Sequence, residues 1–280
     1  MSRAMSRRGT AAAFLLLLLG GPVQAQQRGP DPGVWDGIRY FGTAAATDVW
    51  AVAKAPFEMN RGEAWAFAGV AAVGLALVPF DEPLWEHALE HREDAGYRHV
   101  LRVAKWVEPL ALQGRMNKYY AAGTVAGYIV DSAWDAPWLR HVFEELLISN
   151  IISATGRKTI GRVIGRTRPS TGEGAYNFAF WDGLSFPSGH AANLATLATV
   201  LSHHIDWWPA SVLLYGTVAT VVYERVADSG HWASDSWIGA FVGVGIARIV
   251  IARREADTIE FGPLPSAGFG ALPVGFIIRF

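Results

Sequence analysis

The stretch AWAFAGVAAVGLALVPF, residues 64–80, is an apolar run that contains no charged residue. As an α-helix, 17 residues extend about 25 Å, which approaches the roughly 30 Å of a bilayer's hydrocarbon core once flanking residues are added. The run lacks the alternation of apolar and polar residues that is typical of a half-buried strand. It therefore predicts a helix that can enter a membrane, and it sets the fold class for the rest of the chain.

Five further apolar runs follow, and all of them favour helix. They lie at residues 119–130, 143–156, 190–205, 210–223 and 237–251. Gly and Ala are frequent in them, and small residues let membrane helices approach closely. The sequence predicts an all-α bundle of about six helices over residues 63–254, and the run lengths favour a membrane-embedded one. A soluble bundle with a large core is the alternative, because each run is short or interrupted by polar residues.

The two ends of the chain differ from this domain. Arg3, Arg7 and Arg8 precede AAAFLLLLLGGPV, and a small-residue site ends at Ala25, so residues 1–25 are interpreted as a signal peptide, with an uncleaved anchor as the alternative. Residues 26–62 are predicted to be a lead-in followed by an amphipathic helix at 36–58. Residues 255–280 alternate apolar residues with Gly and Pro, which predicts a short irregular or hairpin tail.

Composition excludes several classes of function. The net charge of −1 and the lack of a basic stripe argue against nucleic acid as a partner. The chain has no cysteine, which rules out disulfides and thiolate metal sites. His87 and His91 have a spacing that could bind a metal, but their charged surroundings predict a solvated helix face. The 12 tryptophans suit a protein at a membrane boundary.

Polar residues gather in three places, each at the end of an apolar run. They are GRKTIGRVIGRTRP (156–169), FPSGH (186–190) and ERVADSGHWASD (224–235). Taken singly, each has an ordinary explanation: basic residues flanking a membrane helix, a turn into a helix, and a surface pair at i and i+4. Taken together, they supply the groups needed for one kind of chemistry.

That chemistry is phosphoryl transfer without a metal or other cofactor. Guanidinium groups bind phosphate oxygens in pairs, and Ser188 with the Gly189 N–H can line an anion site at a helix start. Asp235, four residues after His231, can hold that imidazole in one tautomer and leave the other nitrogen free to attack. His190 can then protonate a leaving oxygen.

The three clusters resemble the motif of the type 2 phosphatidic acid phosphatase family, within the acid phosphatase and vanadium haloperoxidase superfamily. The family pattern is Lys, six residues, Arg-Pro; then Pro-Ser-Gly-His; then Ser-Arg, five residues, His, three residues, Asp. The matching residues, in order, are Arg168-Pro169, Pro187-Ser188-Gly189-His190, Arg225, His231 and Asp235. The resemblance covers roughly residues 140–252.

Two positions depart from the family pattern. The lysine position is Gly161, and either Arg162 or Lys158 nearby could replace the missing charge. The serine before Arg225 is Glu224, an anion beside the expected phosphate pocket, which could alter substrate choice or weaken phosphate binding.

The resemblance implies a mechanism and its residues. His231 attacks phosphorus to give a phosphohistidine, Asp235 orients its ring, and His190 acts as acid and then base. Arg168, Arg225, Ser188 and Gly189 hold the phosphoryl oxygens. The implied substrate is a lipid-linked phosphate or pyrophosphate at the membrane.

Other functions stay open at this point. They are a soluble or peripheral periplasmic acid phosphatase of the same superfamily, a vanadate-dependent haloperoxidase, and a catalytically weak phosphate- or lipid-binding protein. The resemblance implies a site on the periplasmic or exterior face of the inner membrane. If residues 26–62 are exported, three membrane crossings at 64–80, 119–134 and 143–158 would instead put the first cluster in the cytoplasm. The motif is the stronger indication, because several of these runs are short and polar.

Overall fold

The computed structural model describes residues 34–134 and 136–259, and the regular structure in them is helical. The helices, with two short 3-10 turns, are α2 (Val34–Glu58), α3 (Arg61–Leu77), η1 (Val78–Phe80), α4 (Asp81–His91), α5 (Ala95–Ala111), α6 (Gln113–Trp134), α7 (Trp138–Ile164), η2 (Pro169–Thr171), α8 (Gly189–Ile205), α9 (Trp208–Ala227) and α10 (Ala233–Ile259). The predicted all-α fold is confirmed, although these residues form nine α-helices rather than about six.

The difference in helix number comes from the charged segments. Residues 81–118, which lack a long apolar run, contain α4, α5 and the start of α6. The helix predicted at 36–58 is present as α2. At the other end, α10 continues through residues 255–259, which the sequence assigns to the tail. The predicted signal peptide, the lead-in before residue 34 and the tail beyond residue 259 lie outside the described residues.

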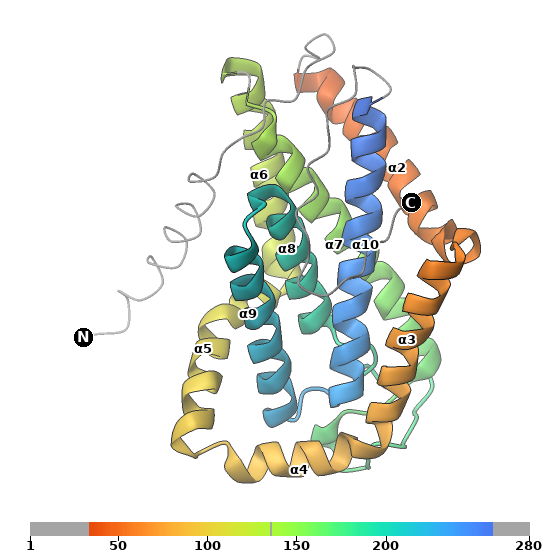
Figure 1. Cartoon of the computed structure of the whole chain (residues 1–280), viewed down its shortest axis with the longest axis vertical. Coiled ribbons are helices and arrows are strands. Elements are labelled where there is room, and N and C mark those ends of the chain that lie inside the picture. The colour runs from red at the N-terminus through yellow and green to blue at the C-terminus, as the bar shows by residue number, and fades with distance from the viewer. Residues whose placement is uncertain (1–33, 135, 260–280) are drawn as a thin grey trace.

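The helices form an elongated bundle in which α8 is central (Figure 1). α8 packs against α5, α7, α9 and α10, while α2 and α3 lie along α10 on the outside. α4 lies across one end of the bundle (Figure 1). Every residue from Ala191 to Leu201 of α8 is buried, so this part of the helix is enclosed by protein on all sides.

Two glycines of α10 bring it unusually close to α8. A Cβ on Gly239 would lie 2.4 Å from the Ser188 carbonyl oxygen, and one on Gly243 would lie 2.2 Å from the Ala192 carbonyl oxygen. Only a residue without a side chain permits such an approach between helix backbones. The start of α10 is thereby fixed against the start of α8, where the second and third motifs lie.

In the described part of the chain, two helical stretches are long and apolar enough to cross a membrane. They are Arg61–His91, which joins α3, η1 and α4, and Ala233–Ala256 in α10. α3 directs large apolar side chains away from the bundle, with Trp65 79% and Leu75 72% exposed. Contiguous apolar surface of this kind is typical of a face that contacts lipid or another partner.

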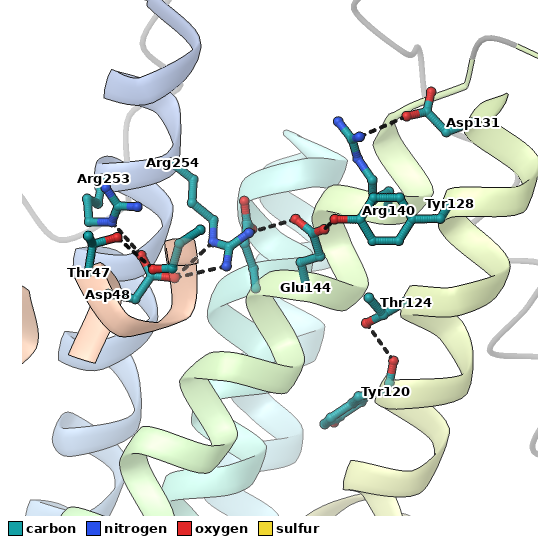
Figure 2. A network of polar contacts seen from close by, with 12 residues as sticks. Thr47, Asp48, Tyr120, Thr124, Tyr128, Asp131, Arg140, Glu144, Arg253 and Arg254 are labelled. Carbon is teal, nitrogen blue, oxygen red and sulfur yellow. Dashed lines mark hydrogen bonds and ion pairs between the residues drawn. The ribbon is translucent and has the colours of Figure 1, made fainter. Parts of the chain in front are cut away.

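A buried charged network ties α2 and α7 to the far end of α10 (Figure 2). The Arg254 guanidinium donates to the Asp48 carboxylate at 2.9 Å and to the Glu144 carboxylate at 2.6 Å. Tyr128 of α6 donates its hydroxyl to Glu144, and Arg253 pairs with Asp48 at 2.6 Å. Each of these charges therefore has an opposite partner, as buried ions require.

Candidate active site

The second motif forms the start of α8. Ser188 is the N-cap residue, buried completely, and its hydroxyl accepts a hydrogen bond from the Ala191 N–H at 3.5 Å. The Ser188 N–H donates to the backbone carbonyl of Asp235 at 3.0 Å, which joins the second motif to the third. His190 follows in the first turn, with its ring centroid 6.1 Å from that of His231.

His231 lies in the tight turn between α9 and α10. The backbone N–H groups of Gly230 and His231 both donate to the Arg225 carbonyl, at 2.9 and 3.2 Å. The His231 side chain is buried, and its Nδ1 lies 2.7 Å from the Ser185 carbonyl oxygen. A carbonyl only accepts, so Nδ1 carries the proton and Nε2 keeps its lone pair.

The environment also keeps His231 neutral. Burial, assisted by the positive charge of Arg168, lowers the pKa of His231 to about 3. At neutral pH the ring is therefore uncharged, with an unprotonated Nε2. That is the state in which an imidazole can act as a nucleophile.

Asp235 has different partners from those that the motif alone suggests. Its carboxylate accepts from the Arg166 guanidinium at 2.7 Å and from the Ser185 hydroxyl, while the proton of the His231 ring goes to the Ser185 carbonyl. A buried carboxylate gains more from a guanidinium than from a neutral ring. Asp235 thus contacts His231 through Ser185 rather than directly.

Arg166 is itself held by a residue far away in the sequence. Asp81, at the start of α4, pairs with Arg166 at 2.8 Å and accepts the backbone N–H of Ser234 at 2.9 Å. Asp81 is fully buried. Sequence reasoning missed Asp81, Arg166 and Ser185 as supports of the site. An acidic residue directly after the apolar run 64–80 was the available signal for Asp81.

Arg225 lies near His190 but forms salt bridges with carboxylates of the protein. Its Nε donates to Glu224 at 2.6 Å, and its Nη2 lies 3.2 Å from Glu108 of α5. Glu224 is buried, so this pair is shielded from water. Glu108 also lies 4.0 Å from His190 Nε2. A phosphate that binds Arg225 must therefore compete with an internal carboxylate.

Cationic groups surround His190. Burial lowers the pKa of His190 to about 4, and the charges of Arg225, Arg168 and Arg157 act in the same direction. Arg168, at the end of the first motif, is exposed at the mouth of this group. The predicted residues His231, His190, Ser188, Gly189, Arg168 and Arg225 are thus brought together by the fold.

Of the basic residues in the first motif, one that was not expected at the site lies against the start of α8. Lys158 and Arg162 are exposed on the outer side of α7. Arg157, one turn before Gly161, is half-buried and lies against the start of α8, with its guanidinium atoms 2.6–2.8 Å from where a Gly189 Cβ would be. The sequence placed Arg157 in the basic cluster without giving it a role. Within residues 34–134 and 136–259, no three His, Asp or Glu side chains are grouped as a metal site would require.

Part of the chain matches a known protein family. Residues 142–258 match the family model described as the PAP2 superfamily. No curated protein matches the chain. Among solved structures, the chain is similar to a transmembrane PAP2-type phosphatidylglycerolphosphate phosphatase from Bacillus subtilis, with 18% identity and a TM-score of 0.47 over 78% of this chain and 94% of that one. The matched residues, 142–258, contain all three motifs.

Proposed function

We propose that the protein is a phosphatase that hydrolyses a lipid-linked phosphate monoester or pyrophosphate through a phosphohistidine, without a metal. The observation that carries the proposal is the state of His231: buried, neutral, with Nδ1 committed to the Ser185 carbonyl and Nε2 free beside His190. Arginine side chains around this pair provide the positive charge that a phosphoryl group needs.

The first half-reaction transfers the phosphoryl group to His231. Nε2 attacks phosphorus, the bond from phosphorus to the leaving oxygen breaks, and His190 gives that oxygen a proton. His190 has a lowered pKa of about 4 in the empty site because of burial and its arginine neighbours. A bound phosphate dianion offsets those charges and raises the pKa of His190, so substrate binding itself prepares the acid.

The second half-reaction returns the enzyme to its starting state. Neutral His190 takes a proton from water as the water oxygen attacks phosphorus. The bond from phosphorus to His231 breaks, and inorganic phosphate leaves. The Gly189 N–H at the start of α8 and the guanidinium groups hold the equatorial oxygens in both steps.

A lipid substrate is supported by the surface around the site. The loop between η2 and α8 exposes aromatic side chains, with Phe180 69% and Trp181 70% exposed. α3, which leads into the Asp81 anchor, exposes apolar side chains along its length. Aromatic rings beside apolar helices are typical of a membrane boundary. We propose the exterior face of the inner membrane as the side on which the site lies.

The test is phosphate release from an aryl phosphate and from a panel of lipid phosphates, using purified protein and His231→Ala as control. We expect faster release from at least one lipid phosphate, no effect of chelators, and inhibition by vanadate. Equal rates for the parent and His231→Ala would overturn the phosphohistidine mechanism. Reporter fusions after residues 60 and 175 test the proposed side of the membrane.

A further inference from the structure

Gly161, at the family's lysine position, has no room for any side chain. A Cβ at this position would lie 2.6 Å from the Phe186 carbonyl oxygen, which belongs to the loop backbone just before the second motif. Backbone cannot yield as the end of a flexible side chain can. The close approach of α7 to this loop therefore requires glycine, and the positive charge has to come from another residue.

Arg157 precedes Gly161 by four residues, so both lie on the same face of α7. Its guanidinium carbon is 2.6 Å from the position of a Gly189 Cβ, which places the charged group directly over the first residue of α8. Gly189 is the residue whose N–H lines the proposed anion site. The absence of a side chain there leaves the space that the guanidinium occupies.

The charge of Arg157 is not balanced within the described part of the protein. Its Nε is buried without a hydrogen-bond partner, and its Nη2 has only a long contact of 3.5 Å to the Gln113 side-chain oxygen. Burial is the main cause that lowers the pKa of Arg157, and the positive charge of Arg168 lowers it further. By contrast, Arg166 and Arg225 each pair with two or more carboxylates. Two cations near each other without an anion form a site that an anion would stabilise.

We propose that Arg157 binds the phosphoryl oxygens together with Arg168 and the Gly189 N–H, and so supplies the positive charge that glycine at position 161 cannot provide. The predicted effect of Arg157 on catalysis rests on the proposed phosphatase function. The predicted binding of an anion by Arg157 does not depend on that function. A guanidinium offers a planar pair of donors where an ammonium is a point charge, so phosphate is held in a more defined orientation.

The first experiment compares Arg157→Met, Arg157→Lys and the exposed control Arg102→Ala. We expect Arg157→Met to weaken binding of inorganic phosphate, measured by calorimetry in detergent, by about 10- to 100-fold. In kcat/KM on an aryl phosphate we expect a loss of about 100-fold. Arg157→Lys should keep part of the phosphate binding and part of the kcat/KM. Arg102→Ala should match the parent in both.

Thermal unfolding separates a binding role from a structural one. Met preserves much of the packing of the Arg stem but removes a buried charge that lacks a partner. We therefore expect the Tm of Arg157→Met without phosphate to equal or exceed that of the parent, while the rise in Tm on adding phosphate disappears. A lower Tm with phosphate binding retained would overturn the proposal.

A second experiment restores the family pattern. Gly161→Lys in the Arg157→Met background should not recover phosphate binding, because its Cβ meets the Phe186 carbonyl. Recovery by Gly161→Lys would overturn the inference, as would a greater loss in Lys158→Ala or Arg162→Ala than in Arg157→Met.

The outcomes distinguish this inference from the proposed function. A parent that binds phosphate through Arg157 but releases none from any substrate supports the inference and contradicts the phosphatase function. An active parent with unchanged phosphate binding and kcat/KM in Arg157→Met contradicts the inference alone. A parent that neither binds phosphate nor turns over contradicts both.

Discussion

Charged side chains are buried near both ends of α10, and the two groups differ in how their charges are balanced. At the far end, Arg254 pairs with Asp48 and Glu144, and Arg253 pairs with Asp48 (Figure 2). At the site end, Arg166 is balanced by Asp81 and Asp235, whereas Arg157 and Arg168 contact no carboxylate among the described residues. A balanced network holds helices together, whereas unbalanced cations beside the proposed nucleophile would be stabilised by an anionic ligand.

The largest expected effect tests whether the site end carries the chemistry. His231→Ala removes the proposed nucleophile and should lower kcat by about 10⁴-fold or more, with little change in the unfolding midpoint. Rates of phosphate release and thermal unfolding on the same preparation measure this. A residual rate of phosphate release within tenfold of the parent would contradict the assignment of the chemistry to the site end of α10.

The matching change at the far end should affect stability instead. Arg254→Met leaves Asp48 and Glu144 buried without their shared guanidinium, which should cost about 3–5 kcal/mol of folding free energy. The KM of the remaining folded enzyme should stay near that of the parent. Chemical unfolding measures the expected loss of folding free energy, and steady-state kinetics measures the KM. A raised KM without a loss of stability would contradict both expectations.

Within the site, Asp235 is expected to act through Ser185. Asp235→Asn should lower kcat about 10- to 100-fold, as loss of an indirect support typically does. Ser185→Ala removes only the hydroxyl that donates to Asp235 and keeps the carbonyl that holds His231. The double variant should therefore lose less than the product of the two single losses, and full additivity would argue for independent roles.

Activity should depend on pH in a direction set by the two histidines. In the free enzyme, His231 is neutral above a pKa of about 3 and His190 is protonated below a pKa of about 4. The value of kcat/KM should therefore fall as pH rises from 5 to 8, by up to about tenfold per unit. The dependence of kcat should be flatter, because bound phosphate raises the pKa of His190.

Stability should respond to pH in the opposite direction. Both pKa values are below that of a free histidine, so the unfolded chain binds more protons between about pH 6.5 and 3. The stability contributed by the neutral rings is complete above pH 6.5 and is lost as pH falls. Unfolding midpoints from pH 8 to 4 measure this, and a midpoint that rises on acidification would contradict it.

The smallest expected effect concerns Glu224. Glu224→Ser introduces the family residue and frees Arg225 from its closest carboxylate. We expect tighter phosphate binding and a KM lowered by about three- to tenfold, with Asp228→Ser, an exposed carboxylate near the same arginine, as the weaker comparison. An unchanged or raised KM would mean that Glu224 helps to position Arg225.

The sequence predicted the parts of the site that depend on local spacing. The turn that holds His231 beside Arg225 and the cap at Ser188 are formed within a few residues, so their motifs indicate them directly. Asp81 meets Ser234 across 153 residues, and Ser185 meets His231 across 46, and no local pattern encodes such contacts. The role proposed for Arg157 has no sign in the sequence, because that role depends on the close packing at Gly161, a property of the fold.

α10 also sets a distance. Ser234, in the site network, and Arg254, in the far network, are twenty residues apart on this one helix, which corresponds to about 30 Å. That is about the thickness of a bilayer's hydrocarbon layer. With α10 across a membrane, the two charged networks would lie at opposite headgroup levels. His231 would then lie at the depth of the phosphate group of the proposed lipid substrate. The substrate could then be hydrolysed while its acyl chains stay in the leaflet.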